Sequence, residues 1–196
     1  MAFIPLESEL RKAGFSLIAG IDEAGRGPLA GPMVSAAVIL KPGARLPGLN
    51  DSKKLSKAAR ERLFPLITAQ AIDFTISIMS HKTVDEINIL ESVKLANLLC
   101  VQALTIRPHI TLIDGRDKQL LTTPFKTVIK GDQKVRCIAA ASILAKVTRD
   151  RLMEHYHETF PNYAFNEHMG YGTRKHRSNI KKEGPCEIHR MSFTLL

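Results

Sequence analysis

The sequence has 196 residues, of which 44% are hydrophobic and 24% are charged, and this excludes a disordered chain, a collagen-like repeat and a disulfide scaffold. The length fits one domain of above-average size. Lys and Arg outnumber Asp and Glu by 28 to 19, so the formal net charge is +9, which suits either a polyanionic partner or a solvated basic surface.

The first half of the chain predicts three strands and one helix. Residues 15–22 and 33–40 are apolar enough for two strands, and the glycine- and proline-rich segment 23–32 between them predicts a turn. A serine cap begins a predicted helix over 56–70. Residues 71–80 alternate polar and apolar side chains, as a half-buried strand does.

The second half alternates helices with short strands. Apolar residues at helical spacing predict a helix over 90–104 that ends before a proline. Short strands follow at 109–114 and 125–130. A long helix is predicted over 134–160, and its alanine-rich first half should be buried. The remaining tail is basic, and we expect it to be irregular apart from a short helix over 173–183.

Strands that pair early and then alternate with helices predict an α/β fold with a central mixed sheet flanked by helices. The sequence contains no internal repeat, low-complexity segment or linker. Residues 1–196 are therefore expected to form a single domain with a short basic C-terminal helical tail.

Four acidic residues stand where these strands are predicted to end: Asp22, Glu23, Asp114 and Asp132. Strand ends are where sites are built in open α/β sheets. Mg²⁺ and Mn²⁺ prefer carboxylate oxygens, so converging carboxylates would form a cage for one or two such ions. Two metals about 3.5–4 Å apart can activate a water and stabilise the leaving oxygen during attack on a phosphodiester.

The acids also have an ordinary explanation, since Asp beside Gly is common in turns. Taken singly, Asp114 and Asp132 fit that explanation well. The adjacent pair Asp22 and Glu23 fits it poorly, because a cluster of carboxylates repels itself and a bound cation relieves the repulsion.

Eight segments, in order along the chain, resemble the blocks of one protein family. They are GIDEAGRGPLAGP (20–32), LNDSKKLS (49–56), INIL (87–90), LIDG (112–115), KGDQK (130–134), AAASILAKVTRDRLM (139–153), GYGTRKH (170–176) and HRMSF (189–193). The chain thus resembles the type 2 ribonucleases H, among them the bacterial ribonuclease HII family. The resemblance implies a ribonuclease H-like catalytic domain.

The resemblance also implies the activity. The family hydrolyses the RNA strand of RNA–DNA hybrids, including single ribonucleotides embedded in duplex DNA, and leaves 3′-hydroxyl and 5′-phosphate ends. The match implies that Asp22, Glu23, Asp114 and Asp132 are both the catalytic and the metal-binding residues, with two Mn²⁺ or Mg²⁺ ions. The expected partners are the RNA–DNA hybrid duplex and DNA that contains ribonucleotides, and we expect a monomer.

Five further residues are expected to bind nucleic acid by the same resemblance: Gly25, Arg26, Gly27, Lys53 and Tyr171. The Gly25-Arg26-Gly27 backbone and the Tyr171 ring would recognise the junction where a ribonucleotide precedes a deoxyribonucleotide. Glycine lets the backbone approach the 2′-hydroxyl that distinguishes RNA from DNA. Lys53 would face the phosphate backbone. Without the family match, Tyr171 could equally be an ordinary core or surface tyrosine. Lys53 could likewise be a solvated lysine, although that explanation fits Lys54 better.

Other polar residues are weaker candidates. Contacts to the phosphate backbone are conceivable for Lys146, Arg149 and Arg190. Neither CxxC nor HExxH accompanies the C-terminal histidines, so we expect surface or hydrogen-bonding roles, not zinc ligands, for His168, His176 and His189. Met169 stands where the family often has lysine, so one phosphate contact is expected to be missing.

Two alternatives remain open: a nucleic-acid-binding module without catalysis, and another nuclease of the same fold, such as a junction resolvase or an exonuclease. The intact acidic quartet opposes the first, and the GRG and GYGT segments oppose the second. We expect no further module before Gly20, which favours type 2 over type 3 enzymes, and no extension after HRMSFTLL.

Nothing in the sequence directs the chain out of the cytoplasm. The N-terminus has acidic residues before any apolar run and no cleavage signature, and no stretch approaches the ~20 apolar residues that cross a bilayer. The cysteines Cys100, Cys137 and Cys186 lie far apart, so we expect reduced thiols. The predicted location is cytoplasmic, with no membrane partner.

Overall fold

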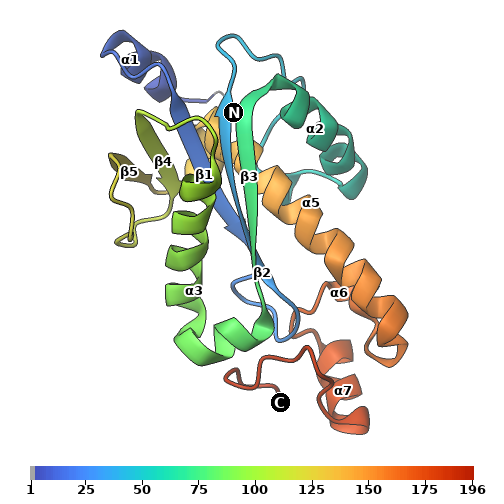
Figure 1. Cartoon of the computed structure of the whole chain (residues 1–196). Helices are drawn as coiled ribbons and strands as arrows, with labels where there is room; N and C mark the ends of the chain where they lie inside the picture. Colours follow the sequence, from blue (N-terminus) through green and yellow to red (C-terminus); the bar gives the residue numbers. More distant parts are fainter. Residues whose placement is uncertain (1–2) are drawn as a thin grey trace.

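A mixed five-stranded sheet forms the centre of the protein in the computed structural model, which describes residues 3–196 (Figure 1). The strands are β1 (Ile18–Ala24), β2 (Met33–Leu40), β3 (Ala71–Met79), β4 (Ile110–Asp114) and β5 (Phe125–Val128), in the order β3-β2-β1-β4-β5. Strands β1, β2 and β3 pair antiparallel, whereas β4 and β5 continue from β1 in parallel. The predicted α/β fold with a mixed sheet is confirmed.

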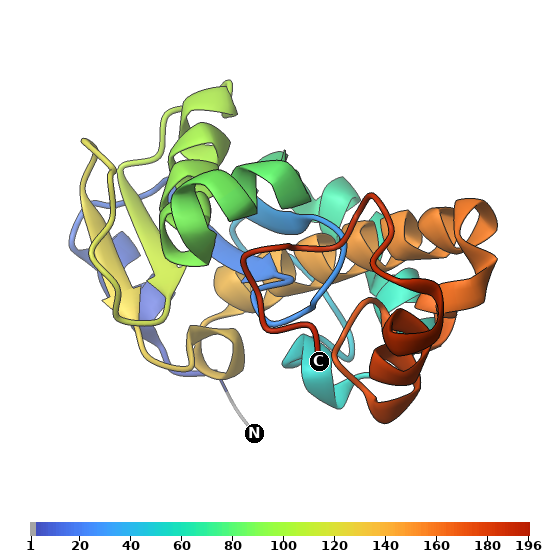
Figure 2. The ribbon, with the colours of Figure 1, turned by 90° about the horizontal axis from the view of Figure 1, so that it is seen from below.

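Helices cover both faces of this sheet. They are α1 (Leu6–Lys12), α2 (Lys57–Gln70), α3 (His81–Ala103), α4 (Gly131–Lys134), α5 (Arg136–Thr159), α6 (Phe165–His168) and α7 (Arg174–Glu183), with 3₁₀ turns η1 (Ser52–Lys54) and η2 (Pro161–Tyr163). The long helices α3 and α5 lie on opposite faces (Figure 1 and Figure 2). Within residues 3–196, no helix combines the length and apolar character that crossing a membrane requires.

Strand β2 is buried on both faces because helices pack on each side of it. Ala36 and Val38 belong to the core beneath α5, whereas Ala37 and Ile39 belong to the core beneath α3. On the neighbouring strand, a Cβ at Gly20 would stand 2.2 Å from the backbone carbon of Cys137. Glycine therefore lets the first turn of α5 touch β1 directly, which brings the helix close to the strand that carries two of the acids.

Helix α3 is longer than the predicted helix over 90–104. Ser80 begins it by accepting a hydrogen bond from the backbone N–H of Thr83 at 3.0 Å. Asn88 interrupts it with φ 64° and ψ 167°, and its side chain then caps the second segment. The apolar periodicity marks only this second segment, so the sequence prediction missed the first. Helix α1 was missed for the same reason, since none of its residues is buried.

The C-terminal tail is a packed unit and not the irregular segment predicted, although the helix over 173–183 is confirmed as α7. Tyr163, Phe165 and Ile180 form a core with Leu29 and Ala30 of the 23–32 turn. Ala30 also pairs with His189 as an isolated bridge. The tail therefore lies against this turn, as the red C-terminal segment does in Figure 2.

Candidate active site

Two neighbouring parallel strands carry three of the four acids. Ile21 of β1 is in register with Ile113 of β4, and the next residues along these strands are Asp22 and Asp114. Asp22 is buried, whereas Glu23 and Asp114 are half-buried. Asp22 and Glu23 lie within the last three residues of β1, which extends to Ala24 and not to Asp22 as predicted.

Asp132 reaches the same place from a different element. Strand β5 ends at Val128, two residues before the predicted end, and Lys130 adopts a left-handed conformation with φ 56°. The chain then forms the short helix α4, on which Asp132 is buried. The prediction that this acid stands at a strand end is therefore wrong. Asp132 nevertheless lies close enough to Asp114 for that negative charge to raise its pKa.

The electrostatics of the four acids reflect their proximity. Burial raises the pKa of Asp22 well above its usual value, and the charges of Glu23 and Asp114 raise it further. Burial also raises the pKa of Glu23 and of Asp132, and Asp114 adds to both shifts. The fold thus brings the predicted acids together, and their negative charges oppose one another.

Each of the four acids accepts a hydrogen bond within the chain, and Asp22 Oδ1 does so from the backbone N–H of Glu23 at 2.8 Å. Glu23 Oε1 accepts from Arg26 Nε at 2.5 Å, and Asp114 Oδ1 accepts from the backbone N–H of Gly131 at 2.6 Å. Lys53 Nζ donates to Asp132 Oδ2 at 3.3 Å. With these contacts, no three His, Cys, Asp or Glu side chains among residues 3–196 stand in a metal-binding arrangement.

The acids nevertheless fit a hard divalent cation. Glu23 Oε2 is buried and has no hydrogen-bond partner among the described residues. A buried polar atom left unpaired is costly, and carboxylate oxygens are the ligands that Mg²⁺ and Mn²⁺ prefer. The unpartnered oxygen and the raised pKa values of its neighbours both indicate a place where positive charge would be stabilised.

A cleft of about 200 Å³ opens beside these acids and gathers the predicted nucleic-acid contacts. It is lined by Glu23, Ala24, Gly25, Arg26, Gly27, Ser52, Lys53, Ser142, Lys146 and Tyr171. All five predicted recognition residues therefore lie together with one of the acids. Ser52 and Ser142 were not predicted, and their hydroxyls are 2.7 Å apart. The sequence did offer one signal for Ser142, because it is a polar residue within the alanine-rich start of α5.

The 23–32 turn is called the GRG turn, and the two glycines of its Gly25-Arg26-Gly27 sequence have different surroundings. Gly25 is buried with φ +104°, and a Cβ there would stand 2.4 Å from Arg149 Nε. Gly27 is exposed, and a Cβ there would meet only the Tyr171 ring, at 3.8 Å. Gly25 is thus required by internal packing and backbone conformation. Both glycines line the cleft, and Gly27 is the exposed one of the two.

Two arginines considered for phosphate contacts are fully buried, so that prediction is wrong for both. Arg149 donates to the carbonyl oxygens of Pro32, Met169 and Ala30. Arg190 donates to those of Gly31 and Arg26. Lys146, the third candidate, does line the cleft.

The C-terminal histidines form a buried hydrogen-bonded cluster and are not surface residues. His176 Nδ1 lies 2.9 Å from the carbonyl oxygen of Tyr171, so this nitrogen must carry the proton. His176 Nε2 then accepts from His189 Nε2 at 3.1 Å, and His189 Nδ1 accepts from the N–H of Cys186 at 2.9 Å. Neutral imidazoles with these tautomers satisfy these three contacts, and the hydrogen-bonded histidines fix the backbone of Tyr171.

Acid should weaken this cluster. Burial lowers the pKa of His176 from 6.5 to about 4. Because the folded pKa is depressed, the stabilisation is complete above about 6.5 and is lost as the pH falls towards about 4. We expect His176→Asn to be less stable than wild type by about 1–3 kcal/mol at pH 7, with a gap that narrows on acidification. Urea unfolding from pH 7 to pH 4.5 measures this, and a constant gap would contradict the assignment.

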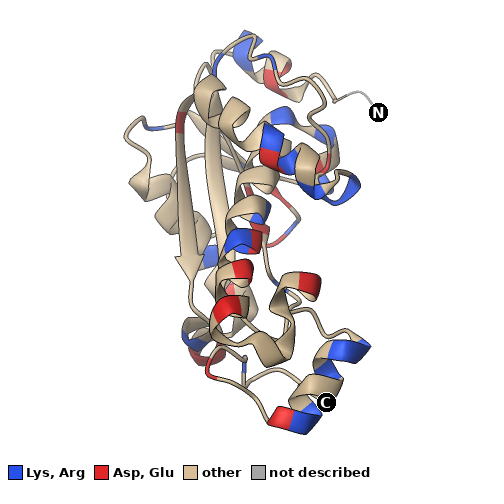
Figure 3. Cartoon of the chain, turned by 90° about the vertical axis from the view of Figure 1, so that its right-hand side faces the viewer, with Lys and Arg blue, Asp and Glu red and all other residues tan. Residues whose placement is uncertain are grey.

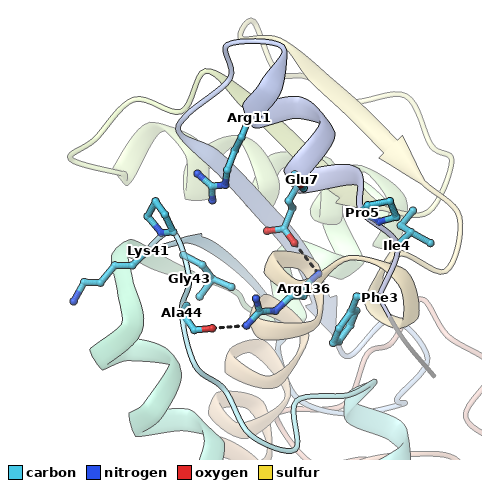
Figure 4. A pocket seen from close by; sticks show the side chains of 12 residues that line it. Phe3, Ile4, Pro5, Glu7, Arg11, Lys41, Gly43, Ala44 and Arg136 are labelled. Atoms are coloured by element: carbon cyan, nitrogen blue, oxygen red, sulfur yellow. Dashed lines mark hydrogen bonds between the residues drawn. The ribbon is translucent and has the colours of Figure 1, made fainter.

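A larger cleft, of about 330 Å³, contains none of the predicted site residues (Figure 4). It lies between α1, the loop after β2 and the start of α5. Glu7 accepts from the backbone N–H of Arg136 at 3.1 Å, and Arg136 donates to the carbonyl oxygen of Ala44 at 2.5 Å. A carboxylate at a helix N-terminus is stabilising. Glu7 therefore holds α1 against the start of α5, and the role of this cleft is structural.

Helix α7 is strongly basic. Helix α7 carries Arg174, Lys175, Arg177, Lys181 and Lys182. Figure 3 shows these blue positions on the helix beside the C-terminus. The tail thus presents positive charge on the same packed unit that holds Tyr171.

Clustered acids on parallel strands, beside a cleft with basic residues, define a metal-dependent nuclease. The comparison with known families agrees, since a family model described as Ribonuclease HII matches residues 19–196. The chain belongs to the ribonuclease HII family.

Relatives from several bacteria are similar over nearly the whole chain. Ribonuclease HII of Geotalea uraniireducens is 51% identical over 192 residues, which are 98% of this chain and 89% of that protein. A ribonuclease HII of Bacillus cereus is 52% identical over 187 residues, which are 95% of this chain and 72% of that protein.

Solved archaeal structures share the fold. Ribonuclease HII of Archaeoglobus fulgidus, in its complex with PCNA, superposes with a TM-score of 0.78 at 29% identity, covering 91% of this chain and 95% of that one. Ribonuclease H2 of Pyrococcus horikoshii gives a TM-score of 0.76 at 28% identity, covering 91% and 94%. The ribonuclease H-like fold predicted from the sequence is confirmed.

Proposed function

We propose that this protein is an endoribonuclease that hydrolyses the RNA strand of RNA–DNA hybrids, including single ribonucleotides embedded in duplex DNA. The observation that carries this proposal is the shared cleft, which Glu23 lines together with the GRG turn and Tyr171. One cleft thus combines one acid of the cluster suited to phosphodiester hydrolysis with residues suited to recognising a sugar. Membership of the ribonuclease HII family supports the same activity.

Asp22, Glu23, Asp114 and Asp132 would hold Mn²⁺ or Mg²⁺, which supplies a polarised water and neutralises charge on the phosphate. The acids would position a water that attacks the phosphorus 5′ of a ribonucleotide. The bond from this phosphorus to the 3′-oxygen of the preceding nucleotide breaks, so the products carry 3′-hydroxyl and 5′-phosphate ends. Arg26 adds positive charge at the edge of the site. It pairs there with Glu23 and, at 3.2 Å, with Asp117.

Recognition belongs to other residues. The exposed backbone at Gly27 can approach a 2′-hydroxyl closely, and glycine is the residue that permits such an approach. Tyr171 is 42% exposed, so its ring is available to stack on the sugar of the next nucleotide. Substrate positioning and selection thus depend on the turn and the ring, whereas hydrolysis depends on the acids.

Three duplexes test this proposal: RNA–DNA, DNA–DNA and RNA–RNA, each incubated with EDTA, Mg²⁺ or Mn²⁺. We expect metal-dependent cleavage of the RNA strand of the hybrid alone. Comparable cleavage of DNA–DNA would indicate another nuclease of the same fold, and binding without cleavage under any metal would indicate a silent binding module.

Lys53 gives a prediction about affinity. Asp51 orients η1 by accepting the N–H of Lys53 at 2.9 Å, and the Lys53 side chain remains 77% exposed. We expect log affinity for a hybrid to fall linearly with log salt, and Lys53→Ala to reduce that slope by about one unit. Binding titrations at several salt concentrations measure it, with Lys54→Ala as the matched control. An equal change in slope for both variants would contradict a specific phosphate contact at Lys53.

We further propose that residues 1–196 act as one catalytic domain, as a monomer in the cytoplasm. The free state of all three cysteines supports a reducing compartment. Size-exclusion chromatography with light scattering tests the monomer, and a dimer mass would overturn it.

A further inference from the structure

We propose that Arg149 is a positioning residue for ribonucleotide selection. It fixes the GRG turn and the loop over residues 169–171, here called the Tyr171 loop, relative to each other without touching the substrate. This inference rests on the proposed function, because it concerns how the recognition residues are placed. It assigns a role to a residue that the hydrolytic site does not use.

The guanidinium of Arg149 joins two segments that are far apart in sequence. Its Nε donates to Pro32 O at 2.9 Å and its Nη2 to Ala30 O at 3.2 Å, both at the end of the GRG turn. Its Nη1 donates to Met169 O at 2.9 Å, two residues before Tyr171. The same guanidinium carbon lies 5.8 Å from the centre of the Tyr171 ring. One planar group therefore sets the backbone on both sides of the recognition cleft.

The fit around Arg149 leaves little freedom. A Cβ on Gly25 would stand 2.4 Å from Arg149 Nε, so the first glycine of the GRG turn rests on the guanidinium. The two segments also touch directly, since Leu29 N donates to Gly170 O at 2.8 Å and a Cβ on Gly170 would stand 2.5 Å from Ala30 O. A shift of the guanidinium would therefore move the turn and the loop relative to each other.

The charge of Arg149 is expensive to bury, which argues for a specific role. Arg149 is 0% exposed and forms no ion pair with a carboxylate of residues 3–196. Arg190, also 0% exposed, reinforces the arrangement by donating to Arg26 O at 3.1 Å within the GRG turn. Burying a charge without a counter-ion is unfavourable, and a guanidinium is retained here because its rigid fork satisfies three carbonyl groups at once.

The test is a selectivity ratio: kcat/KM at a single embedded ribonucleotide divided by kcat/KM within an all-RNA strand. It is measured for wild type, Arg149→Lys and Arg149→Met, well below each melting temperature. Arg151→Met is the matched control, because Arg151 lies on the same helix but is 52% exposed and pairs with Glu61. We expect the ratio to fall by up to about a hundredfold in Arg149→Met, the loss that a misplacement of about 1 Å can cause, and to stay unchanged in the control.

A double-mutant cycle separates positioning from simple loss of stability. If Arg149 acts through Tyr171, Arg149→Met should change the ratio no further in a Tyr171→Ala background. A merely structural arginine would lower both activities together, and an unchanged ratio in Arg149→Met would overturn the proposal. If that variant does not fold, Arg149→Lys decides, since an ammonium cannot reproduce the fork and a wild-type ratio would again overturn it. A wild type that shows no preference for the embedded ribonucleotide would instead overturn the proposed function itself.

Discussion

Asp22→Asn should abolish hydrolysis while making the metal-free protein more stable. The substitution preserves shape but removes one carboxylate from the acidic cluster, so we expect the cleavage rate to fall at least about a thousandfold, equivalent to about 4 kcal/mol. Stability should change in the opposite direction. Because the folded pKa of Asp22 is raised, its charge destabilises the native state as the pH rises above the usual carboxyl range. Removing the charge should raise the melting temperature in EDTA by at least about 2 °C.

The measurement combines rates at saturating Mn²⁺ with thermal melting in EDTA and in Mn²⁺. Added metal should raise the melting temperature of wild type more than that of Asp22→Asn, because only wild type keeps the full ligand set. Asp114→Asn should lose activity in the same way. Glu158→Gln removes a charge that is 76% exposed and should change neither property. Near-wild-type cleavage by Asp22→Asn would contradict the assignment of the acids.

Tyr171→Ala should remove selection of the junction more than it removes hydrolysis. The ring is exposed in the cleft, with Lys146 Nζ 5.9 Å from its centre, and none of the acids accepts a hydrogen bond from it. Loss of a stacking contact costs roughly 1–3 kcal/mol of binding. We therefore expect the ratio of cleavage at a single embedded ribonucleotide to cleavage within an all-RNA strand to collapse in this variant.

Tyr171→Phe is the matched control, because it keeps the ring and removes only the hydroxyl. It should retain most of the ratio, and an intermediate loss would indicate that the hydroxyl also holds a phosphate or a sugar. Both variants need circular dichroism spectra like that of wild type, since His176 and the tail pack around this loop. An equal ratio in all three proteins would show that Tyr171 is an ordinary surface tyrosine.

The sheet and the acids were predictable because their signals are local. Asp22, Glu23 and Asp114 follow apolar runs that form β1 and β4, and parallel pairing then places them side by side. Asp132 was identified although its predicted position at a strand end is wrong, because a left-handed Lys130 ends the strand early and begins a helix. The acid itself was grouped with the others because Gly131 and Asp132 belong to the KGDQK segment, and it lies near enough to Asp114 for that charge to raise its pKa.

Arg149 and His176 were not predictable in the same way, because their partners are set by tertiary contacts. Pro32 is 117 residues from Arg149, and nothing in the local pattern distinguishes an arginine that binds carbonyl groups from one that binds phosphates. The three histidines likewise become neutral and buried only when the tail folds against the GRG turn. Polar residues whose partners lie far along the chain give no periodic signal.

The most direct measurement uses a DNA duplex that contains one ribonucleotide, incubated with Mn²⁺ and with EDTA, followed by identification of the new ends. The proposed function predicts a single metal-dependent cut on the 5′ side of the ribonucleotide, with a 3′-hydroxyl on one product and a 5′-phosphate on the ribonucleotide. No cleavage with any divalent metal, or an equal cut in the matched all-DNA duplex, would contradict it.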